Sequence, residues 1–271
     1  ASESARTLHG IVSPMSIEQS TTNDAGLIPP DAMLIDGSSS AQQFVDFGEG
    51  FVRNILVPRA GLLPTDVFLD LGCGNGSIAR ALTTFLALPG RYEGLDIHGE
   101  SIRWLQEHYR QHAGFRFSHA NVYNKMYNPG GSLTASQYRL PYADGAFTMA
   151  LLKSVFTHML PDDVRSYLRE LSRVLRPGGR AVTTYFLLNE ESRSFVDRGK
   201  DEIKMRFDWE GDPRCRVANP EMPEEATAHD EARIRSYAAE AGFSVFEMTF
   251  GNWCGRPSLL GLQDLVILIK L

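Results

Sequence analysis

The stretch Val67-Phe-Leu-Asp-Leu-Gly-Cys-Gly-Asn-Gly76 decides the fold of this chain. Its apolar first half predicts a buried strand, and three glycines at alternate positions predict a tight turn that opens a helix. Asp70 stands near the end of the strand, beside the turn. Because glycines let the backbone approach a ligand closely, a strand, this turn and a helix predict a site for a nucleoside-like cofactor. The spacing D-x-G-x-G-x-G is not the dinucleotide pattern G-x-G-x-x-G, which argues against a dehydrogenase.

A second acid, Asp96, follows 20 residues after Gly76, in the segment Tyr92-Glu-Gly-Leu-Asp-Ile97. It falls at the end of the next predicted strand, where the two ribose hydroxyls of an adenosyl group are bound in folds of this kind. A carboxylate at that position repels a 2′-phosphate. The sequence therefore disfavours a ligand of the NADP type.

The rest of the chain alternates between strand and helix patterns. Strands are predicted at 67–71, 92–97, 115–122, 147–152, 180–188, 243–250 and 265–271, and helices at 41–58, 77–88, 99–112, 161–175 and 230–241. This alternation predicts an α/β fold, a doubly wound Rossmann-like sheet that is mostly parallel, with helices on both faces. Residues 251–263 contain no convincing helix, so we expect the last strand to return antiparallel to its neighbour.

Three segments break the alternation. Residues 1–40 form an N-terminal arm, which we interpret either as a tail without fixed structure or as a lid, with a short helix near 16–20. Residues 123–142 and 189–229 are predicted as inserted loops on the substrate side, because long loops inside a compact domain are usually functional or disordered. The domain proper is expected to span residues 41–271.

Composition narrows the classes of partner. The chain has 271 residues, a net charge of −6 and three cysteines without a C-x-x-C pair. The acidic balance argues against a nucleic-acid partner. The cysteines fit neither a disulfide framework nor a zinc site, and no metal is expected. We expect no membrane span and a cytoplasmic location, and a homo-oligomer remains open.

Four motifs together resemble the class I S-adenosylmethionine-dependent methyltransferase family, in its small-molecule type. The motifs are Asp70–Gly76, Gly94–Ile97, Leu140–Phe147 and Val174–Gly179, in the family's order and spacing. The resemblance covers about residues 41–271. It implies S-adenosyl-L-methionine as cofactor and a small-molecule acceptor as substrate.

The resemblance also implies roles for individual residues. Asp70 would reach the amino group of the methionine moiety, Asp96 would take both ribose hydroxyls, and Ile97 would pack on the adenine. The remaining cofactor residues are, by position, Gly72, Cys73, Gly74 and Gly76 in the loop, Asn121 and Val122 near the adenine amino group, and Lys153 and Ser154 at the methionine end.

A hydroxyl acceptor needs a base as well as an in-line approach to the methyl group. His158 follows the fourth strand on the ligand side, and we predict it as the general base; the alternative is that it only orients its loop. A hydroxyl of a sugar or secondary metabolite, as in natural product biosynthesis, is the first choice of acceptor. N-methylation of a small molecule, or a cofactor-binding partner protein without catalysis, stays open.

Overall fold

In this computed structural model the described residues are 25–35 and 37–271. Most of the predicted N-terminal arm, including the helix expected near 16–20, lies outside them. The described part of the arm contains two short 3-10 turns, η1 (Ala25–Leu27) and η2 (Asp31–Met33). No helix within residues 25–35 and 37–271 is long and apolar enough to cross a membrane.

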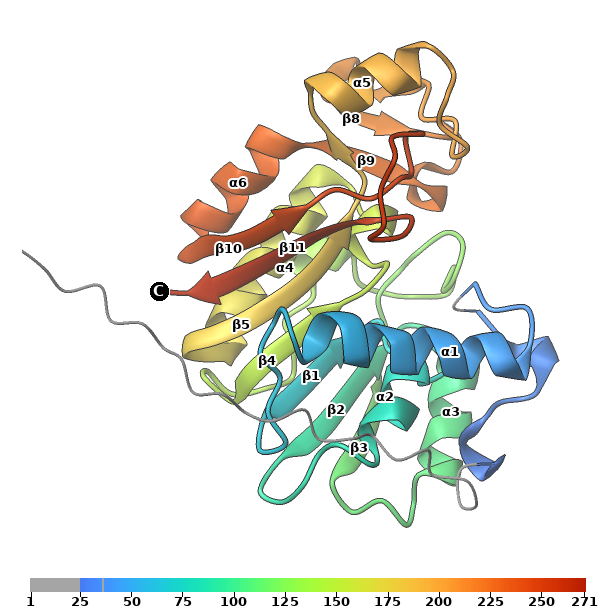
Figure 1. Cartoon of the computed structure of the whole chain (residues 1–271), viewed down its shortest axis with the longest axis vertical. Coiled ribbons are helices and arrows are strands. Elements are labelled where there is room, and N and C mark those ends of the chain that lie inside the picture. The colour runs from blue at the N-terminus through green and yellow to red at the C-terminus, as the bar shows by residue number, and fades with distance from the viewer. Residues whose placement is uncertain (1–24, 36) are drawn as a thin grey trace, which may run out of the picture.

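A seven-stranded sheet of order β10-β11-β5-β4-β1-β2-β3 forms the centre of the molecule (Figure 1). Its strands are β1 (Val67–Leu71), β2 (Arg91–Asp96), β3 (Phe115–His119), β4 (Phe147–Leu152), β5 (Leu175–Tyr185), β10 (Phe243–Thr249) and β11 (Asp264–Lys270). β11 runs antiparallel to both β5 and β10, while the other pairs are parallel, as the sequence predicts. Strand order reverses between β1 and β4, and ligands bind at such a reversal in open α/β sheets.

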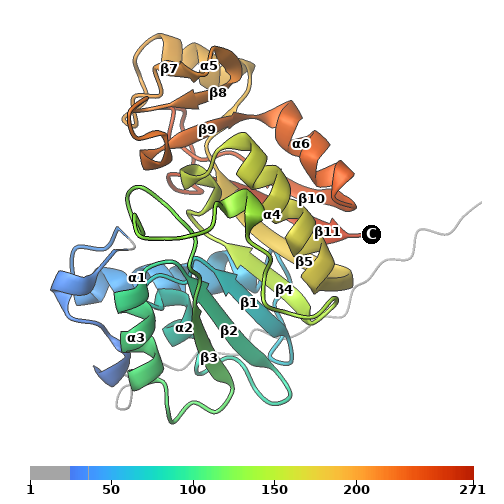
Figure 2. The same ribbon diagram turned by 180° about the vertical axis from the view of Figure 1, so that it is seen from behind.

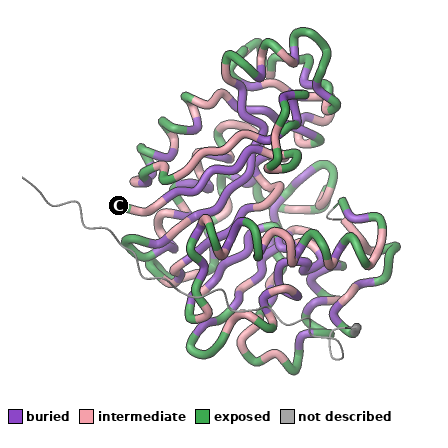
Figure 3. Tube along the Cα trace, viewed as in Figure 1, coloured by how far each residue is buried: buried purple, intermediate pink, exposed green. Residues whose placement is uncertain are grey.

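Helices cover both faces of this sheet. One layer consists of α1 (Ala41–Phe51), α2 (Ser77–Leu82) and α3 (Gly99–His108), and the other of α4 (Pro161–Val174) and α6 (Glu231–Glu240). Neighbouring side chains of β1 point to opposite faces of the sheet. Phe68 packs in the core beneath α2 and α3, and Leu69 packs in the core beneath α4. Figure 2 shows α4 and α6 from their own side, and Figure 3 shows the buried strands between the two layers.

Several predicted helices have bounds different from those expected, and the helix predicted over 99–112 ends at His108. The helix predicted over 77–88 ends at Leu82, because the Thr83 hydroxyl donates to the Arg80 carbonyl oxygen at 2.7 Å and Thr83–Thr84 form a β-branched pair. The helix predicted over 41–58 continues beyond α1 as a π-helical turn, η3 (Val52–Leu56). Residues 176–179 of the fourth motif lie within β5, as a bulge between the pairs Phe147–Leu175 and Met149–Arg180.

The segment 189–229, expected as a loop, has regular structure. It contains α5 (Glu190–Asp197), β7 (Phe207–Trp209), β8 (Asp212–Val217), η6 (Pro223–Glu225) and β9 (Thr227–Asp230). With β6 (Leu187–Leu188) its strands form a second sheet of order β6-β9-β8-β7, which we call the inserted sheet (Figure 1). Its core includes Trp253 and Cys254 from a distant loop, so the apolar pattern within 189–229 is incomplete on its own.

The segment 123–142 is largely irregular, as expected. It holds two isolated bridges, Val122–Leu133 and Asn124–Asn128, and one 3-10 turn, η4 (Ala135–Gln137). The turn η5 (Phe156–His158) follows β4 and faces the inserted sheet, where Phe156 and His158 make hydrogen bonds to His229 and Glu224. The segment 123–142 and the turn η5 both lie at the carboxyl ends of the parallel strands, on the side where the glycine loop opens.

Candidate cofactor and acceptor site

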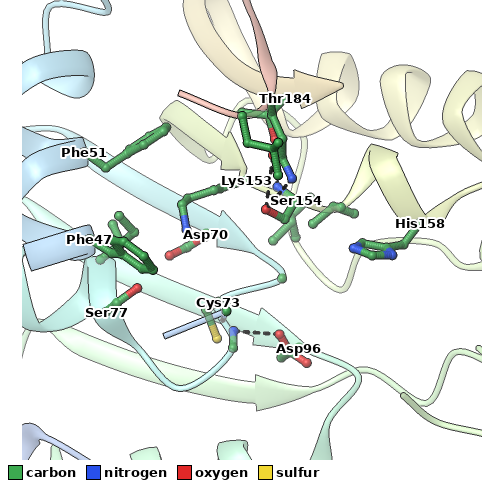
Figure 4. A pocket seen from close by; sticks show the side chains of 18 of the residues that line it. Phe47, Phe51, Asp70, Cys73, Ser77, Asp96, Lys153, Ser154, His158 and Thr184 are labelled. Atoms are coloured by element: carbon green, nitrogen blue, oxygen red, sulfur yellow. Dashed lines mark hydrogen bonds between the residues drawn. The ribbon is translucent and has the colours of Figure 1, made fainter. Parts of the chain in front are cut away.

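A cavity of about 1240 Å³ lies at the carboxyl ends of the parallel strands. The glycine loop, α1, η5 and the loop before β11 form its walls (Figure 4). Most of the predicted site residues line it: Asp70, Gly72, Cys73, Gly74, Asp96, Ile97, Val122, Lys153, Ser154 and His158. The fold thus brings together residues from β1, β2, β4 and their loops in one space.

Two predicted cofactor residues are not among those that line the cavity. Asn121 is exposed, and its side-chain amide donates to the Ser132 hydroxyl at 2.8 Å. Gly76 is the N-cap of α2 with φ 86°, and a Cβ there would come within 2.6 Å of the Leu105 side chain. Its glycine is therefore explained by the turn and by packing against α3.

The backbone at Gly74 leaves room for a ligand. Its φ of 53° is in the left-handed region, and a Cβ added there would meet no atom within 4 Å. Gly72 differs, since at φ 79° a Cβ would meet Val155 at 2.4 Å. Open space above Gly74, in the middle of the loop, is where a cofactor would contact the backbone.

Asp96 is held rigidly at the end of β2. Its two carboxylate oxygens accept from the backbone N–H groups of Gly74 and His98, both at 2.7 Å. Burial raises the pKa of Asp96 above its ordinary value, although these two hydrogen bonds oppose the rise. The His98 imidazole turns to the N-terminus of α3, where its Nδ1 accepts from the Ser101 N–H, and it is not among the cavity residues.

Asp70 is almost fully buried beneath the glycine loop. Its carboxyl group accepts a hydrogen bond from the Tyr92 hydroxyl at 2.6 Å. Burial raises the pKa of Asp70 to about 7, against the lowering influence of Tyr92 and of the cationic Lys153. Near neutral pH this group is poised between its two protonation states, so a cation beside it would ionise it.

His158 lies at the other end of the cavity from the glycine loop (Figure 4). Its Nδ1 is 2.8 Å from the Glu224 carbonyl oxygen, and its ring meets the Tyr127 ring edge-on with centroids 5.6 Å apart. A carbonyl can only accept, so the neutral ring carries its proton on Nδ1 and its lone pair on Nε2. Burial lowers the pKa of His158, which keeps the ring neutral at neutral pH.

Several cavity residues were not predicted as site residues. Helix α1 contributes Asp46, Phe47 and Phe51, and the loop before β11 contributes Leu259 and Gln263. The helical periodicity of residues 41–58 includes Phe47 and Phe51 in its apolar stripe, but periodicity does not show which apolar side chains face a cavity and which are packed in the core. The loop residues reach the site because β11 lies next to β5, a pairing that local sequence does not encode.

A polar group of three residues interrupts the wall at the end of β4. Ser154 has φ 60°, its backbone N–H donates to the Thr184 hydroxyl at 2.8 Å, and its own hydroxyl lies 3.0 Å from the Gln263 amide nitrogen. A non-glycine residue in the left-handed region is strained, and such strain gathers at functional sites. Figure 4 shows Ser154 close to Thr184, with His158 to one side.

The fold and the site define a class of protein. Residues 69–183 match the model of a family described as a methyltransferase domain. This segment is a methyltransferase domain of the class I S-adenosylmethionine-dependent kind, whose cofactor is S-adenosylmethionine. A solved SAM-dependent methyltransferase structure from Methanosarcina mazei shares the fold, with 22% identity and a TM-score of 0.53, over 78% of this chain and 94% of that one.

Two curated relatives are similar over part of their length. One, from a Nostoc species, is named 2-phytyl-1,4-naphtoquinone methyltransferase and is 26% identical over 153 residues, 56% of this chain and 61% of its own. The other, from Amycolatopsis mediterranei, is named 27-O-demethylrifamycin SV methyltransferase and is 32% identical over 132 residues, 48% of this chain and 43% of its own. This chain therefore spans about half the length of the curated relatives it matches.

Proposed function

We propose that this protein transfers the methyl group of S-adenosylmethionine to a hydroxyl of a medium-sized, mainly apolar acceptor, with His158 as the general base. The observation that carries the proposal is the neutral His158 ring, fixed with its lone pair on Nε2, in the same cavity as Asp70, Asp96 and the glycine loop. When bound, the cofactor supplies an electrophilic methyl group on a sulfonium.

The carboxylates at the glycine loop suit a cationic cofactor. Asp96, already held by two backbone N–H groups, has lone pairs left for two ribose hydroxyls. Asp70 would accept from the methionine ammonium, and Lys153 would face the carboxylate end. The space above Gly74 admits the ribose and methionine part against the backbone.

The acceptor would lie between Ser154 and His158. The cavity as a whole has mainly apolar walls, to which Val155 and Met159 from the chain around His158 and Leu262 from the loop before β11 contribute. A cavity of about 1240 Å³ is larger than the roughly 300–1,000 Å³ of ordinary small-molecule pockets, which leaves room for an acceptor beside the cofactor. A wall that is mainly apolar leaves most hydroxyls of a free sugar without a partner, so a hydroxylated secondary metabolite is favoured.

The N-terminal arm would close the cofactor end of the cavity as a lid. Its described part already touches the loop, since the Ile35 N–H donates to the Asn75 side-chain oxygen at 2.9 Å. Ile35 and Gly37 also line the cavity. A lid in this place would exclude water from the transferring methyl group.

The proposal is tested in two steps. Calorimetry with S-adenosylhomocysteine first establishes cofactor binding, and transfer of labelled methyl is then measured on hydroxylated aromatic and polyketide acceptors. Each acceptor is paired with an analogue that carries an amine in place of the hydroxyl, and with a glycoside. Preference for the amine members would replace O-methylation by N-methylation; binding without transfer to any acceptor would favour a non-catalytic partner protein.

A further inference from the structure

Two hydrogen bonds of opposite sense join the inserted sheet to the turn η5, which carries His158. His158 Nδ1 donates to the Glu224 carbonyl oxygen in η6, at 2.8 Å. In return, His229 Nε2 donates to the Phe156 carbonyl oxygen at 3.1 Å. Since each acceptor is a carbonyl, the two bonds fix the tautomers of both rings.

The strand β9 supports both of these hydrogen bonds, one directly and one through a neighbouring turn. His229 is fully buried on β9, and Thr227, two residues earlier, is fully buried as well. The Thr227 hydroxyl donates to the Pro223 carbonyl oxygen at 2.8 Å and so closes the η6 turn that presents the Glu224 carbonyl. Residues i and i+2 of a strand share one face, so one face of β9 holds η5 directly and η6 through Pro223.

The opposite face of β9 serves a different purpose. Ala228, between these two residues, packs in the core of the inserted sheet with Val196 and Met205. The strand therefore separates two roles, stability on one face and contact with the catalytic turn on the other. Core variants on the Ala228 side offer matched controls for variants on the Thr227 and His229 side.

We infer that Thr227 and His229 are positioning residues that hold the His158 ring with its proton on Nδ1 and its lone pair on Nε2. The inference rests on the proposed role of His158 as general base. A neutral imidazole with the proton on Nε2 has no lone pair there to receive the proton of a hydroxyl. In serine hydrolases a buried carboxylate fixes the tautomer of the catalytic histidine. Here backbone carbonyls held in place by β9 would fix the tautomer of His158.

The direct test reads the tautomer without cofactor or acceptor. The full chain is labelled with 15N-histidine, and the His158 signals are assigned by their loss in His158→Gln. In the unsubstituted protein and in the core control Val196→Ala, His158 is expected to be protonated on Nδ1. In Thr227→Val and His229→Leu, a share of His158 should move to the Nε2-protonated form. His229→Gln, which keeps a side-chain N–H donor, should restore the Nδ1 form.

Turnover provides the second measurement, on an acceptor found by the transfer assay. Thr227→Val and His229→Leu should lower kcat by about tenfold to a hundredfold, as for misplacement of a catalytic group, with the KM for S-adenosylmethionine nearly unchanged. Unchanged tautomers in both variants, or the same tautomer shift in Val196→Ala, would overturn the inference. Full turnover in His158→Gln is a separate result, which would remove the base from the proposed function while the tautomer data still decide the positioning.

Discussion

The Tyr92 hydroxyl donates a hydrogen bond to the Asp70 carboxyl group at 2.6 Å, inside the sheet and next to the glycine loop. Tyr92 is fully buried on β2, and its ring stacks on Phe68, whose centroid is 5.9 Å away. The carboxyl is thus anchored by the core on one side and borders the cavity on the other. A buried acid in this position costs stability when it ionises and becomes useful when a cation arrives.

The affinity for S-adenosylmethionine should rise with pH between 6 and 8. Free Asp70 has a pKa of about 7, because burial raises it. A bound ammonium and sulfonium would lower that pKa, so binding below pH 7 must release a proton and is weaker there. Calorimetry at pH 6 and pH 8, in buffers of different ionisation enthalpy, measures both effects. A flat affinity profile in the unsubstituted protein would contradict the assignment of Asp70.

Asp70→Asn should stabilise the cofactor-free protein at pH 8 and weaken cofactor binding. The folded pKa of about 7 lies above the ordinary value of 3.8, so the contribution of Asp70 to stability is fully present below pH 3.8 and is lost as pH rises through 7. The amide never ionises and avoids that loss. Affinity should fall by about tenfold to a hundredfold, the worth of a hydrogen bond to a charged group. Thermal unfolding at pH 8 and calorimetry read the two effects.

Asp96→Ala should reduce affinity for S-adenosylmethionine by more than about a hundredfold, since it removes the expected ribose contacts and also frees the Gly74 N–H. Glu93→Ala, on the same strand and not among the cavity residues, is the control and should bind normally. Calorimetry on both variants decides the point. Equal affinity in Asp96→Ala and the control would rule out the ribose role.

His158→Ala should cut turnover by about a hundredfold, the usual worth of a general base, and leave cofactor affinity nearly intact. In the unsubstituted protein kcat should decrease at acid pH, because only the neutral ring of His158 accepts a proton. The midpoint of this decrease should lie below the ordinary histidine pKa of about 6.5, because burial lowers the pKa of His158. The other titratable cavity residues on the elements around His158 are Asp163, Glu224, Tyr127 and Tyr167. Loss of the decrease at acid pH in the variant identifies it with His158.

Gly74→Ala and Gly76→Ala should separate binding from stability. At Gly74 the added methyl group meets no protein atom and projects into open space, so it should weaken cofactor binding with a stability loss of about 1–2 kcal/mol from the left-handed backbone. At Gly76 it meets Leu105, so the stability loss should be larger. Chemical denaturation paired with calorimetry compares them. The reverse order would mean that the space above Gly74 is not the cofactor site.

Local sequence determined the central fold and the residues that we assign to the cofactor. The run from Val67 to Gly76 encodes a strand, a turn and a helix through nearest neighbours alone, and Asp96 follows at a fixed distance along the next strand. Alternation and turn residues then indicate the sheet, and the lack of a helix in the link before β11 indicates its antiparallel direction. The sequence signals for these features each lie within a few residues of the chain.

Tertiary structure alone decided the rest. The inserted sheet could not be predicted, because Trp253 and Cys254 complete its core from outside the segment 189–229. The tautomer of His158 depends on the Glu224 carbonyl, 66 residues away, and Gln263 meets Ser154 across 109 residues. Hydrogen bonds between such distant positions leave no periodic signal in the sequence. Local patterns thus identify the cavity residues that we assign to the cofactor, whereas the part of the cavity that we assign to the acceptor forms only when the long-range pairings have formed.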